Sequence, residues 1–502
     1  MKISSWAWAC ALSGCLFMGN AMGQGLRQPF SVRPAGFDYN RFLQDDAASP
    51  SDQPAPVVEA APAQPVPAAP AAVAPVVMGS GVSAGCTSCA PSVSYDMGCN
   101  SCAPSCNSCG CNSCGCGLGL DLGIELEDWC LGEPWTLMDL LFGCNKDCAA
   151  ENGWDIGGHS QWGYQDSPDG AFTGNGPFLN QREWNRFGLN QQYLYIGKNA
   201  SAGCGEIGLG FRVDLMYGVD GNEGQSFGNV DPGRFDFLNG WDHGIYEWAM
   251  PQLYGEVAVG EDLLVKVGHF YTLIGYEVVP SSGQFFYSRQ LTFWNSEPFT
   301  HTGALATYTA SDKLTVNGGW VFGMDSGFYQ LGSANAFLGG LTYEISDKTS
   351  FVYTTTFGDL GWRGHGAINS FILSQQWTDK LSSAHQFDVL GTDLRQANGA
   401  PADFRDPNSY TARDSTGFIH YLFYDLNNAV KAGGRMEWYK ADSVSYYTLT
   451  GGVNVKATAN LTVRPEVRKM WAPGNPDTYT GAGYTGQLFN QTVFGVDAIL
   501  TF

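Results

Sequence analysis

The sequence predicts an all-β fold: a transmembrane antiparallel up-and-down β-barrel of about 16 strands, with a disordered, Cys-rich N-terminal arm. Three observations predict it. Charged residues are only 15% of the chain while aromatic residues reach 14% and Gly numbers 65, as expected for many short strands joined by turns. From Trp154 onward, alternating apolar and polar runs are separated by turn-rich segments. The chain also finishes on an alternating strand.

That last strand carries its apolar residues on one face up to its final residue. The opposite face holds mainly Gly495, Asp497 and Thr501. The closing strand of a transmembrane barrel needs this arrangement, because lipid lies outside it. The ending resembles the C-terminal assembly signal of bacterial outer-membrane proteins. The apolar positions are Phe494, Val496, Ala498, Leu500 and Phe502.

Strand-like runs fill the chain from residue 153 to residue 502. At about 10 residues per strand and as many per connection, this length holds about 16 strands. An exported multi-domain β-sandwich is the alternative, and the single unbroken run of short strands disfavours it. The runs begin at Trp154, Phe187, Ile207, Leu253, Leu263, Ala304, Leu314, Phe337, Phe351, Ile368, Phe387, Phe418, Val430, Tyr447, Leu461 and Phe494.

The first 23 residues are typical of an export signal peptide. Lys2 precedes a largely apolar stretch, and residues 21–23 offer small side chains for cleavage. Residues 12–15 also resemble a lipoprotein box, which would leave Cys15 lipidated; the apolar residues after Cys15 favour ordinary cleavage. No later stretch approaches about 18 uninterrupted apolar residues. We therefore expect export without a membrane helix, and location in a bacterial outer membrane.

Residues 24–85 form an expected Ala/Pro-rich linker. Within it, residues 47–77 hold 8 Pro and 11 Ala, which favours polyproline geometry and cannot build a core. We expect this segment to act as a spacer. The more specific alternative is a tether through the periplasmic cell wall. The N-terminal arm is accordingly expected in the periplasm.

Residues 86–150 are an expected Cys-rich segment. Twelve of the 15 cysteines lie here. Paired Cys-x-x-Cys spacing suits a zinc site, an exported compartment favours disulfides, and a loose redox-variable tract is the third alternative. After signal removal 13 cysteines remain, so at least one thiol is free or pairs between chains. The candidate metal ligands are Cys86, Cys89, Cys99, Cys102, Cys106, Cys109, Cys111 and Cys114.

Between the cysteine pairs and the barrel, residues 133–143 suit a short helix with Pro134 near its start and Gly143 at its end. Its apolar residues include Trp135 and Leu141. Such a helix packs on the barrel mouth, or alternatively lies in the membrane interface.

The stretch 250–303 carries a family resemblance. Its most recognisable pieces are 268–270 (GHF), 275–277 (GYE) and 297–303 (EPFTHTG). It resembles the OmpL-like group of bacterial outer-membrane β-barrel porins over roughly residues 150–502, so we place the barrel domain at 151–502. The resemblance implies a barrel that passes small hydrophilic solutes or ions, and it supplies no catalytic residues.

Alternation also predicts which side chains face the lumen. Where one face of a strand is apolar and outward, the opposite residues line the pore. On three consecutive strands this places five basic residues in one wall, together with two acidic ones. The predicted pore-lining residues are Lys431, Arg435, Glu437, Lys456, Arg464, Glu466 and Arg468.

Residues 277–297 break the alternation through 280–283 (PSSG). We expect a constriction loop folded into the lumen, bearing Glu277, Arg289 and Glu297. Its two glutamates would face the basic wall and create a transverse field for zwitterionic solutes. The alternative is that these charges simply pair, as buried charges usually do.

Enzyme function is not expected, because the 7 histidines are dispersed and no nucleophile elbow or phosphate loop is present. No cofactor is indicated, and the net charge of −22 argues against nucleic-acid binding. Expected partners are outer-membrane lipid and small solutes or ions, with further copies of the chain or intermolecular disulfide partners as additional candidates. The alternative function is a barrel-anchored structural envelope protein crosslinked through its Cys-rich segment.

Overall fold

The computed structural model describes only part of the chain. The predicted signal peptide, the predicted linker and the cysteine pairs between Cys86 and Cys114 lie outside the described residues. Within the described part, no helix is long and apolar enough to cross a membrane. The described residues are 127–166, 187–202, 206–226, 242–243, 246–330, 333–395, 401, 412–473 and 491–502.

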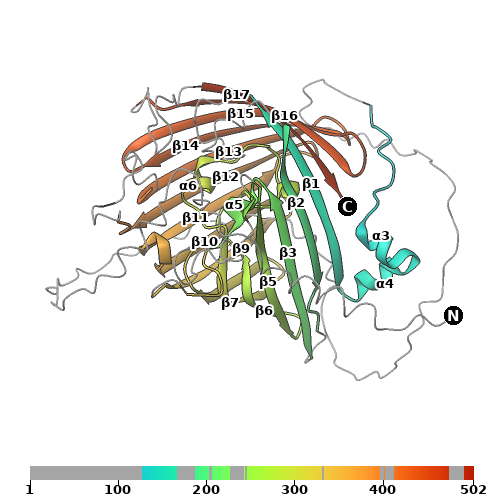
Figure 1. Ribbon diagram of the computed structural model, residues 1–502, viewed down its shortest axis with the longest axis horizontal. Coiled ribbons are helices and arrows are strands. Elements are labelled where there is room, and N and C mark those ends of the chain that lie inside the picture. The colour runs from blue at the N-terminus through green and yellow to red at the C-terminus, as the bar shows by residue number, and fades with distance from the viewer. Residues whose placement is uncertain are drawn as a thin grey trace, which may run out of the picture. The chain divides into compact units, whose positions relative to one another are not determined.

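The strands form one antiparallel sheet that curves into a closed barrel (Figure 1). Of the 17 strands in this described sheet, β4 is a two-residue bridge to β5. The others follow one another in chain order, and β1 pairs with both β2 and β17, which closes the ring. The prediction of an antiparallel barrel of about 16 strands is therefore confirmed.

The strand bounds are β1 Trp154–Gln165, β2 Phe187–Lys198, β3 Ile207–Gly218, β4 Asp242–His243, β5 Tyr246–Val259, β6 Leu263–Tyr271, β7 Thr300–Ser311, β8 Leu314–Val321, β9 Asn335–Ser346, β10 Thr349–Asp359, β11 His365–Gln376, β12 Leu381–Thr392, β13 Asp414–Asp425, β14 Val430–Ala441, β15 Val444–Lys456, β16 Leu461–Trp471 and β17 Gln491–Thr501. The helical elements are α3 Leu137–Phe142, η1 Gly143–Asn145, α4 Lys146–Glu151, α5 Gly221–Gly224, η4 Ser281–Gly283, α6 Leu291–Asn295 and η5 Gly361–Arg363.

Burial along the strands is the reverse of that in a soluble sheet. In β17, Phe494 and Leu500 are exposed, whereas Asp497 between them is only 1% exposed. In β14, Met436 is 52% exposed and its neighbour Arg435 is fully buried. Large apolar side chains thus cover the outside of the barrel and polar side chains fill its interior, which is the pattern a lipid-facing wall requires.

The short helix before the barrel starts later than predicted. Thr136 and Asp139 form a capping box, in which each side chain bonds the other's backbone N–H, so α3 begins at Leu137 and Pro134 stays outside it. Gly143 ends the helix with φ of 54°, a conformation that favours glycine.

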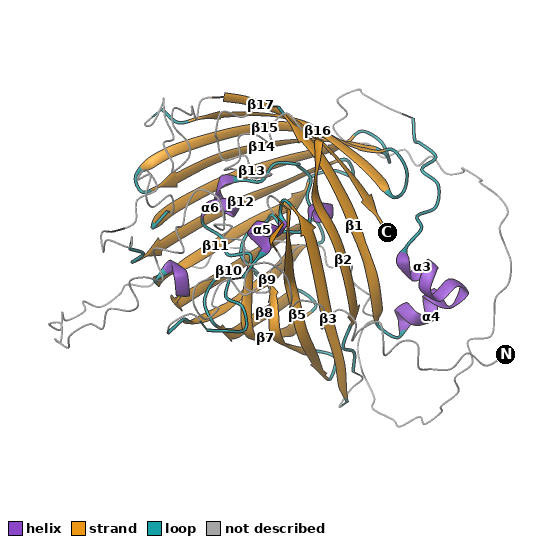
Figure 2. Cartoon of the chain, in the orientation of Figure 1, coloured by secondary structure: helices purple, strands orange, loops and turns teal. Residues whose placement is uncertain are grey.

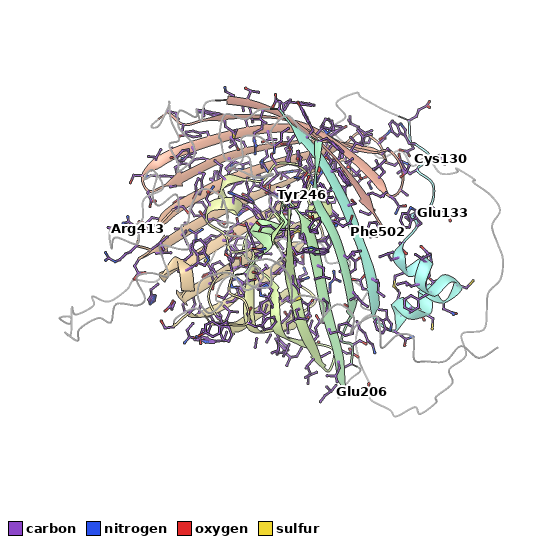
Figure 3. The ribbon with its side chains drawn as sticks, viewed as in Figure 1. Cys130, Glu133, Glu206, Tyr246, Arg413 and Phe502 are labelled. Atoms are coloured by element: carbon purple, nitrogen blue, oxygen red, sulfur yellow. The ribbon has the colours of Figure 1, made fainter. Side chains whose placement is uncertain are left out.

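The segment leading to α3 is held at the end of the barrel where the short turns lie. The side-chain amide of Asn428 bonds both the N–H and the carbonyl of Trp129, each at 2.9 Å. Asn460 bonds the backbone of Trp135 in the same way, at 3.0 and 2.7 Å. Each asparagine side chain therefore makes the same pair of backbone hydrogen bonds that a residue on a neighbouring strand would make. Figure 3 shows Cys130 and Glu133 near Phe502, with Arg413 at the opposite end of the barrel.

Phe502 lies on the outer surface of the wall, beside Gly158 of β1. The N–H of Phe502 donates to the Gly158 carbonyl at 3.0 Å, and the ring of Trp135 stacks on the Phe502 ring at 6.0 Å. A Cβ added to Gly158 would meet the Phe502 ring at 2.8 Å and would also collide with the backbone carbonyl of Tyr193. The seam between β1 and β17 therefore needs glycine at this position.

We predict that Gly158→Ala destabilises the folded barrel by roughly 1–3 kcal/mol, because the added methyl group overpacks a rigid seam. The matched control is Gly451→Ala, since a Cβ at that outward-facing strand glycine meets nothing within 4 Å. Urea-unfolding midpoints of the two variants in lipid vesicles measure the difference. Equal midpoints for Gly158→Ala and Gly451→Ala would contradict the prediction.

Candidate functional site

The β6–β7 loop, residues 272–299, turns inward and contains η4 and α6 (Figure 2). Its side chains and backbone contact inward-facing residues on β2, β12, β13, β14 and β16. The loop leaves the wall at β6 and β7, which lie opposite β14 and β15 in the ring. It therefore reaches across the interior to the far wall.

Arg435 on β14 is the main contact between that wall and the loop. Its Nη1 donates to Glu277 Oε1 at 2.6 Å and to the Ser288 carbonyl at 2.8 Å. Its Nη2 donates to the Ser288 hydroxyl at 2.9 Å. The guanidinium also lies 5.1 Å from the centroid of the Phe286 ring. A planar cation with several fixed donors can hold the loop in one orientation.

Two acidic side chains of the same wall bind the loop backbone. Glu437 accepts from the N–H groups of Leu291 and Thr292, both at 2.8 Å, and thereby caps the start of α6. Glu466 on β16 accepts from the Ser288 N–H at 3.1 Å. These carboxylates satisfy backbone donors that the loop carries into the interior.

Arg464 on β16 joins the loop to β17. Its Nε and Nη2 contact the two oxygens of Asp497 at 2.9 and 2.5 Å. Its Nη1 donates to the carbonyls of Ser281 and Gln284 in the loop, at 3.2 and 2.7 Å. Gln161 on β1 supplies a further donor to Asp497 at 2.6 Å.

The predicted wall residues fall into two groups. Five are buried and face inward: Arg435, Glu437, Arg464, Glu466 and Arg468. Lys431 is half-buried, with its Nζ 3.2 Å from Asp425, and Lys456 is exposed. Both lysines lie toward the short turns, away from the loop. The three arginines and two lysines that were predicted for this wall therefore do not form a single uniform surface.

The two loop glutamates, both expected to face the basic wall, lie in different places. Glu277 touches Arg435 directly and also accepts from the Tyr421 hydroxyl at 2.9 Å. Glu297 does not face the basic side chains; its Oε1 accepts from Gln386 Nε2 of β12 at 2.6 Å. Charge pairing, the alternative considered from the sequence, is the observed arrangement at Glu277.

Arg289 is directed at its own loop. Its guanidinium donates to the carbonyls of Val278 and Val279, the second at 2.6 Å. Gln191 on β2 donates to the same Val279 carbonyl at 2.9 Å and accepts from the Ser281 N–H at 3.0 Å. Arg289 therefore braces the loop internally while Gln191 fastens it to the wall.

Sequence reasoning missed several residues that hold the loop. They include Gln191, Gln386 and Tyr421, whose polar groups bond loop atoms, and Arg363, which donates to the Asn295 carbonyl at 2.6 Å. Alternation contained the signal for Gln386, which lies on the inward face of β12 with Ala384 and Asp388. The prediction selected arginine and glutamate because they are charged, whereas many of the hydrogen bonds that hold the loop come from neutral polar side chains.

Glu297 of the loop and Asp388 of β12 are buried carboxyl groups, and one oxygen of each, Oε2 of Glu297 and Oδ2 of Asp388, has no hydrogen-bond partner. Two neighbouring carboxylates repel each other unless one of them holds a proton. Burial, reinforced by the neighbouring Asp388 charge, raises the pKa of Glu297 well above its ordinary value. Protonation of Glu297 therefore removes a repulsion between this end of the loop and β12, to which its Oε1 is attached through Gln386.

We predict that this attachment is pH-dependent. Because the folded-state pKa of Glu297 is raised, its stabilisation is present at low pH and is lost as the pH rises through the raised value. Hydrogen exchange of residues 286–299, followed from about pH 5 to pH 9 after correction for intrinsic exchange, measures it. Glu297→Gln keeps a neutral hydrogen-bonding side chain and should flatten the profile. A flat profile in the unmodified protein would refute the assignment.

The described residues contain no cluster of three or more His, Cys, Asp or Glu side chains able to hold a metal ion. The arrangement consists of fixed charges and amides that keep a loop across the interior of a barrel. Such an arrangement narrows a lumen and sets the charge along its walls.

Three solved structures resemble the chain at low sequence identity. OprB of Pseudomonas putida gives a TM-score of 0.47 at 12% identity, covering 72% of this chain and 97% of that one. An anion-selective porin from Comamonas acidovorans gives 0.45 at 11% identity, covering 70% and 99%. The channel DcaP of Acinetobacter baumannii gives 0.44 at 8%, covering 70% and 97%. No curated protein matches the chain.

A family model covers the whole barrel. It is described as "Putative beta-barrel porin-2, OmpL-like" and matches residues 153–502, from the residue before β1 to the last residue of the chain. The match includes the inward β6–β7 loop and the basic side chains of β14 and β16. The chain belongs to this OmpL-like family of β-barrel porins.

Proposed function

We propose that the protein is a diffusion pore through which small hydrophilic solutes or ions cross the outer membrane. The observation that carries the proposal is the β6–β7 loop fastened across the interior of a closed barrel. A barrel of about 16 strands is wide enough for an aqueous lumen, and an inserted loop reduces that lumen to the size of small solutes. The outer-membrane location follows from the family and the fold.

The charges at the loop support a structural as well as a selective role. Arg435 and Glu277 neutralise each other at 2.6 Å, as do Arg464 and Asp497 at 2.5 Å. A paired wall presents little net field to a passing ion. We therefore propose that these pairs set the width of the constriction, and that the less buried Lys431 and Lys456 contribute more to the charge of the aqueous path.

Planar-bilayer recording of the reconstituted protein tests the proposal. We expect stable open steps, with a reversal potential in a salt gradient that reports the net charge of the path. A correctly folded barrel that never conducts would refute a diffusion pore.

We predict that Arg435→Ala shifts the selectivity toward cations and increases current fluctuations. The substitution leaves the Glu277 carboxylate without its cationic partner and removes four hydrogen bonds to the loop. The control is Arg413→Ala, because Arg413 is partly exposed and pairs with the exposed Asp414. Identical reversal potentials and noise for Arg435→Ala and Arg413→Ala would show that the pair has no part in conduction.

We further propose that the N-terminal arm lies on the periplasmic side. In outer-membrane barrels short turns face the periplasm and long loops face outward. The segment bearing Trp129 and Trp135 is fastened to Asn428 and Asn460, which lie in short turns between β13 and β14 and between β15 and β16. Residues 129–135, in the later part of the Cys-rich segment, then lie at the periplasmic rim.

A second candidate function is a barrel-anchored structural protein crosslinked through its cysteines. The exposed free thiols of Cys130 and Cys144, next to the rim, favour it. We predict slower-migrating species on gels of purified outer membranes without reductant, prepared with a thiol-blocking agent, which collapse to one band with reductant. Identical mobility in both conditions would exclude intermolecular disulfides and leave the pore as the sole proposal.

A further inference from the structure

The charges that fasten the loop are out of reach of a passing solute. In the Arg435–Glu277 pair and in the Arg464–Asp497 pair, no side chain is more than 3% exposed. A solute in an aqueous path can contact only side chains that reach the water-filled space. The charged groups that meet solute must therefore be inward-facing side chains that keep some exposed surface.

Two ion pairs of the inner wall keep such a surface, and both are closed by a hydrogen bond. Arg212 of β3 donates from Nη1 to Asp155 of β1 at 2.8 Å. Lys431 of β14 donates from Nζ to Asp425 of β13 at 3.2 Å. Each of these cations already has a carboxylate as its hydrogen-bond partner, which reduces its attraction for an anion in the lumen.

Lys266 of β6 lacks such a bond. Its Nζ lies 3.9 Å from Oε1 of Glu256, the residue directly opposite it on β5. That separation is longer than a hydrogen bond, and no other group in the described part of the chain accepts from this Nζ. The ammonium instead lies 4.7 Å from the centroid of the Tyr254 ring, within the range of a cation–π interaction. Its three N–H donors are therefore available to a partner in the lumen.

The Lys266 side chain faces the lumen. Its chain neighbour Val267 is exposed on the outer face of the barrel, whereas Glu256, its partner on β5, is buried inside. On the other side Lys266 pairs with Leu305 of β7, which is also buried inside. The Lys266 side chain itself is 30% exposed. An inward-facing side chain with this much exposed surface is accessible from the space within the ring of strands.

This position lies between the loop and the short turns. β6 begins at Leu263, directly after its short connection to β5, and the β6–β7 loop leaves the strand after Tyr271. At about 3.4 Å per residue, Lys266 is about 10 Å from the first end of β6 and about 17 Å from the second. A solute that crosses the barrel past the loop therefore also passes the level of Lys266.

We propose, on the basis of the diffusion pore above, that Lys266 is a solute-binding residue of the aqueous path and takes the carboxylate of a small organic anion. The carboxylate oxygens accept from the N–H donors that Glu256 leaves unused. The Tyr254 ring and the Leu305 side chain place apolar surface beside the ammonium, which suits an organic anion better than a bare halide ion.

Glu256 limits the strength of this binding. Its Oε2 accepts from the N–H of Ala200 at 3.2 Å, which fixes the carboxylate beside the ammonium. The negative charge of Glu256 opposes the entering anion, so the anion binds weakly and is released again. A pore needs this balance, because a solute that binds too tightly blocks the path.

Bilayer recording of the reconstituted full-length protein tests the site. The probes are potassium chloride and potassium acetate, each applied as a salt gradient. We expect Lys266→Gln to lower the permeability of acetate relative to potassium about twofold or more, and that of chloride by less. Glu256→Gln should raise both ratios, because it removes the negative charge beside the same ammonium. Lys266→Arg keeps the positive charge and should stay close to the unmodified protein.

The matched control is Lys198→Gln, at the same end of the neighbouring wall. Lys198 of β2 carries the same charge but lies on the outer face, paired with Trp154 of β1 and Phe211 of β3. This substitution should leave both permeability ratios unchanged.

Open steps with equal acetate ratios for Lys266→Gln and Lys198→Gln would overturn the Lys266 site and leave the diffusion pore standing. A folded barrel without open steps would overturn both. Equal effects of Lys266→Gln on chloride and acetate would overturn the assignment to a carboxylate. If Lys266→Gln does not fold, Glu256→Gln decides, and unchanged ratios in that variant would overturn the site.

Discussion

Closure of the sheet governs the rest of this molecule. In the hydrocarbon part of a membrane there is no water to satisfy backbone N–H and C=O groups, so strands can cross it only in a ring without free edges. The ring closes where β1 pairs with β17, from His159 opposite Thr501 to Gln165 opposite Gly495. Once it is closed, each strand residue faces either lipid or the interior. The reversed burial of β14 and β17 follows directly from that division.

The interior side of that division creates a second requirement. Arginine and glutamate side chains on adjacent strands are brought into a confined space, where unpaired charges are costly. The β6–β7 loop supplies what the wall alone lacks: a carboxylate for Arg435, backbone N–H groups for Glu437 and Glu466, and carbonyls for Arg464. Wall and loop satisfy each other, so the position of the loop is a consequence of the strand sequences. A constriction built in this way is rigid, because moving the loop would leave several buried polar groups without hydrogen-bond partners at the same time.

Period-two patterning made most of the barrel predictable. Runs expected to begin at Trp154, Phe187, Ile207, Leu263, Leu314, Val430 and Leu461 begin at those residues in β1, β2, β3, β6, β8, β14 and β16. The other strands begin earlier than expected, because each one extends toward the N-terminus beyond the first clearly alternating residue. β5 starts at Tyr246, seven residues before the expected Leu253, and Pro251 interrupts the pattern between the two. Side-chain direction at Arg435, Arg464 and Arg468 was predictable for the same reason.

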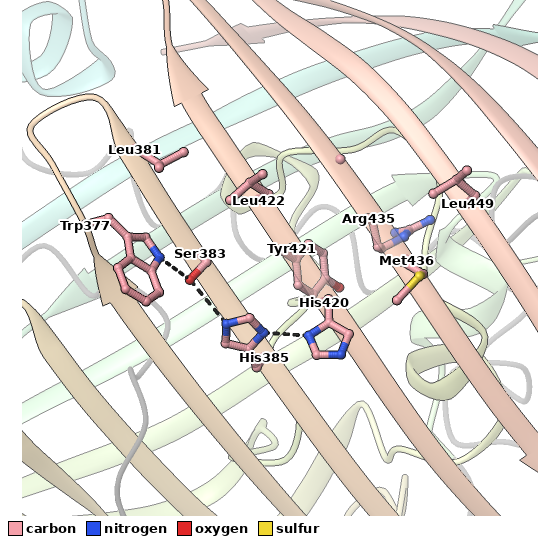
Figure 4. Close-up of a pocket in the computed structure, with 11 residues that line it drawn as sticks. Trp377, Leu381, Ser383, His385, His420, Tyr421, Leu422, Arg435, Met436 and Leu449 are labelled. Atoms are coloured by element: carbon pink, nitrogen blue, oxygen red, sulfur yellow. Dashed lines mark hydrogen bonds between the residues drawn. The ribbon is translucent and has the colours of Figure 1, made fainter. Parts of the chain in front are cut away.

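The loop was less predictable, since its conformation depends on contacts distant in sequence. Nothing near Glu297 in the chain indicates that its neighbour is Asp388 of β12, or that Gln386 lies between the two elements. Four polar side chains on the outer wall show the same limit (Figure 4). Trp377, Ser383 and His385 are close in sequence and contact one another, yet His385 also contacts His420, which lies across the sheet. Inside and outside the barrel, alternation thus decides which face a polar residue occupies. The hydrogen-bond partner of such a residue comes from tertiary structure on both faces, as Glu277 does for Arg435 inside and His420 does for His385 outside.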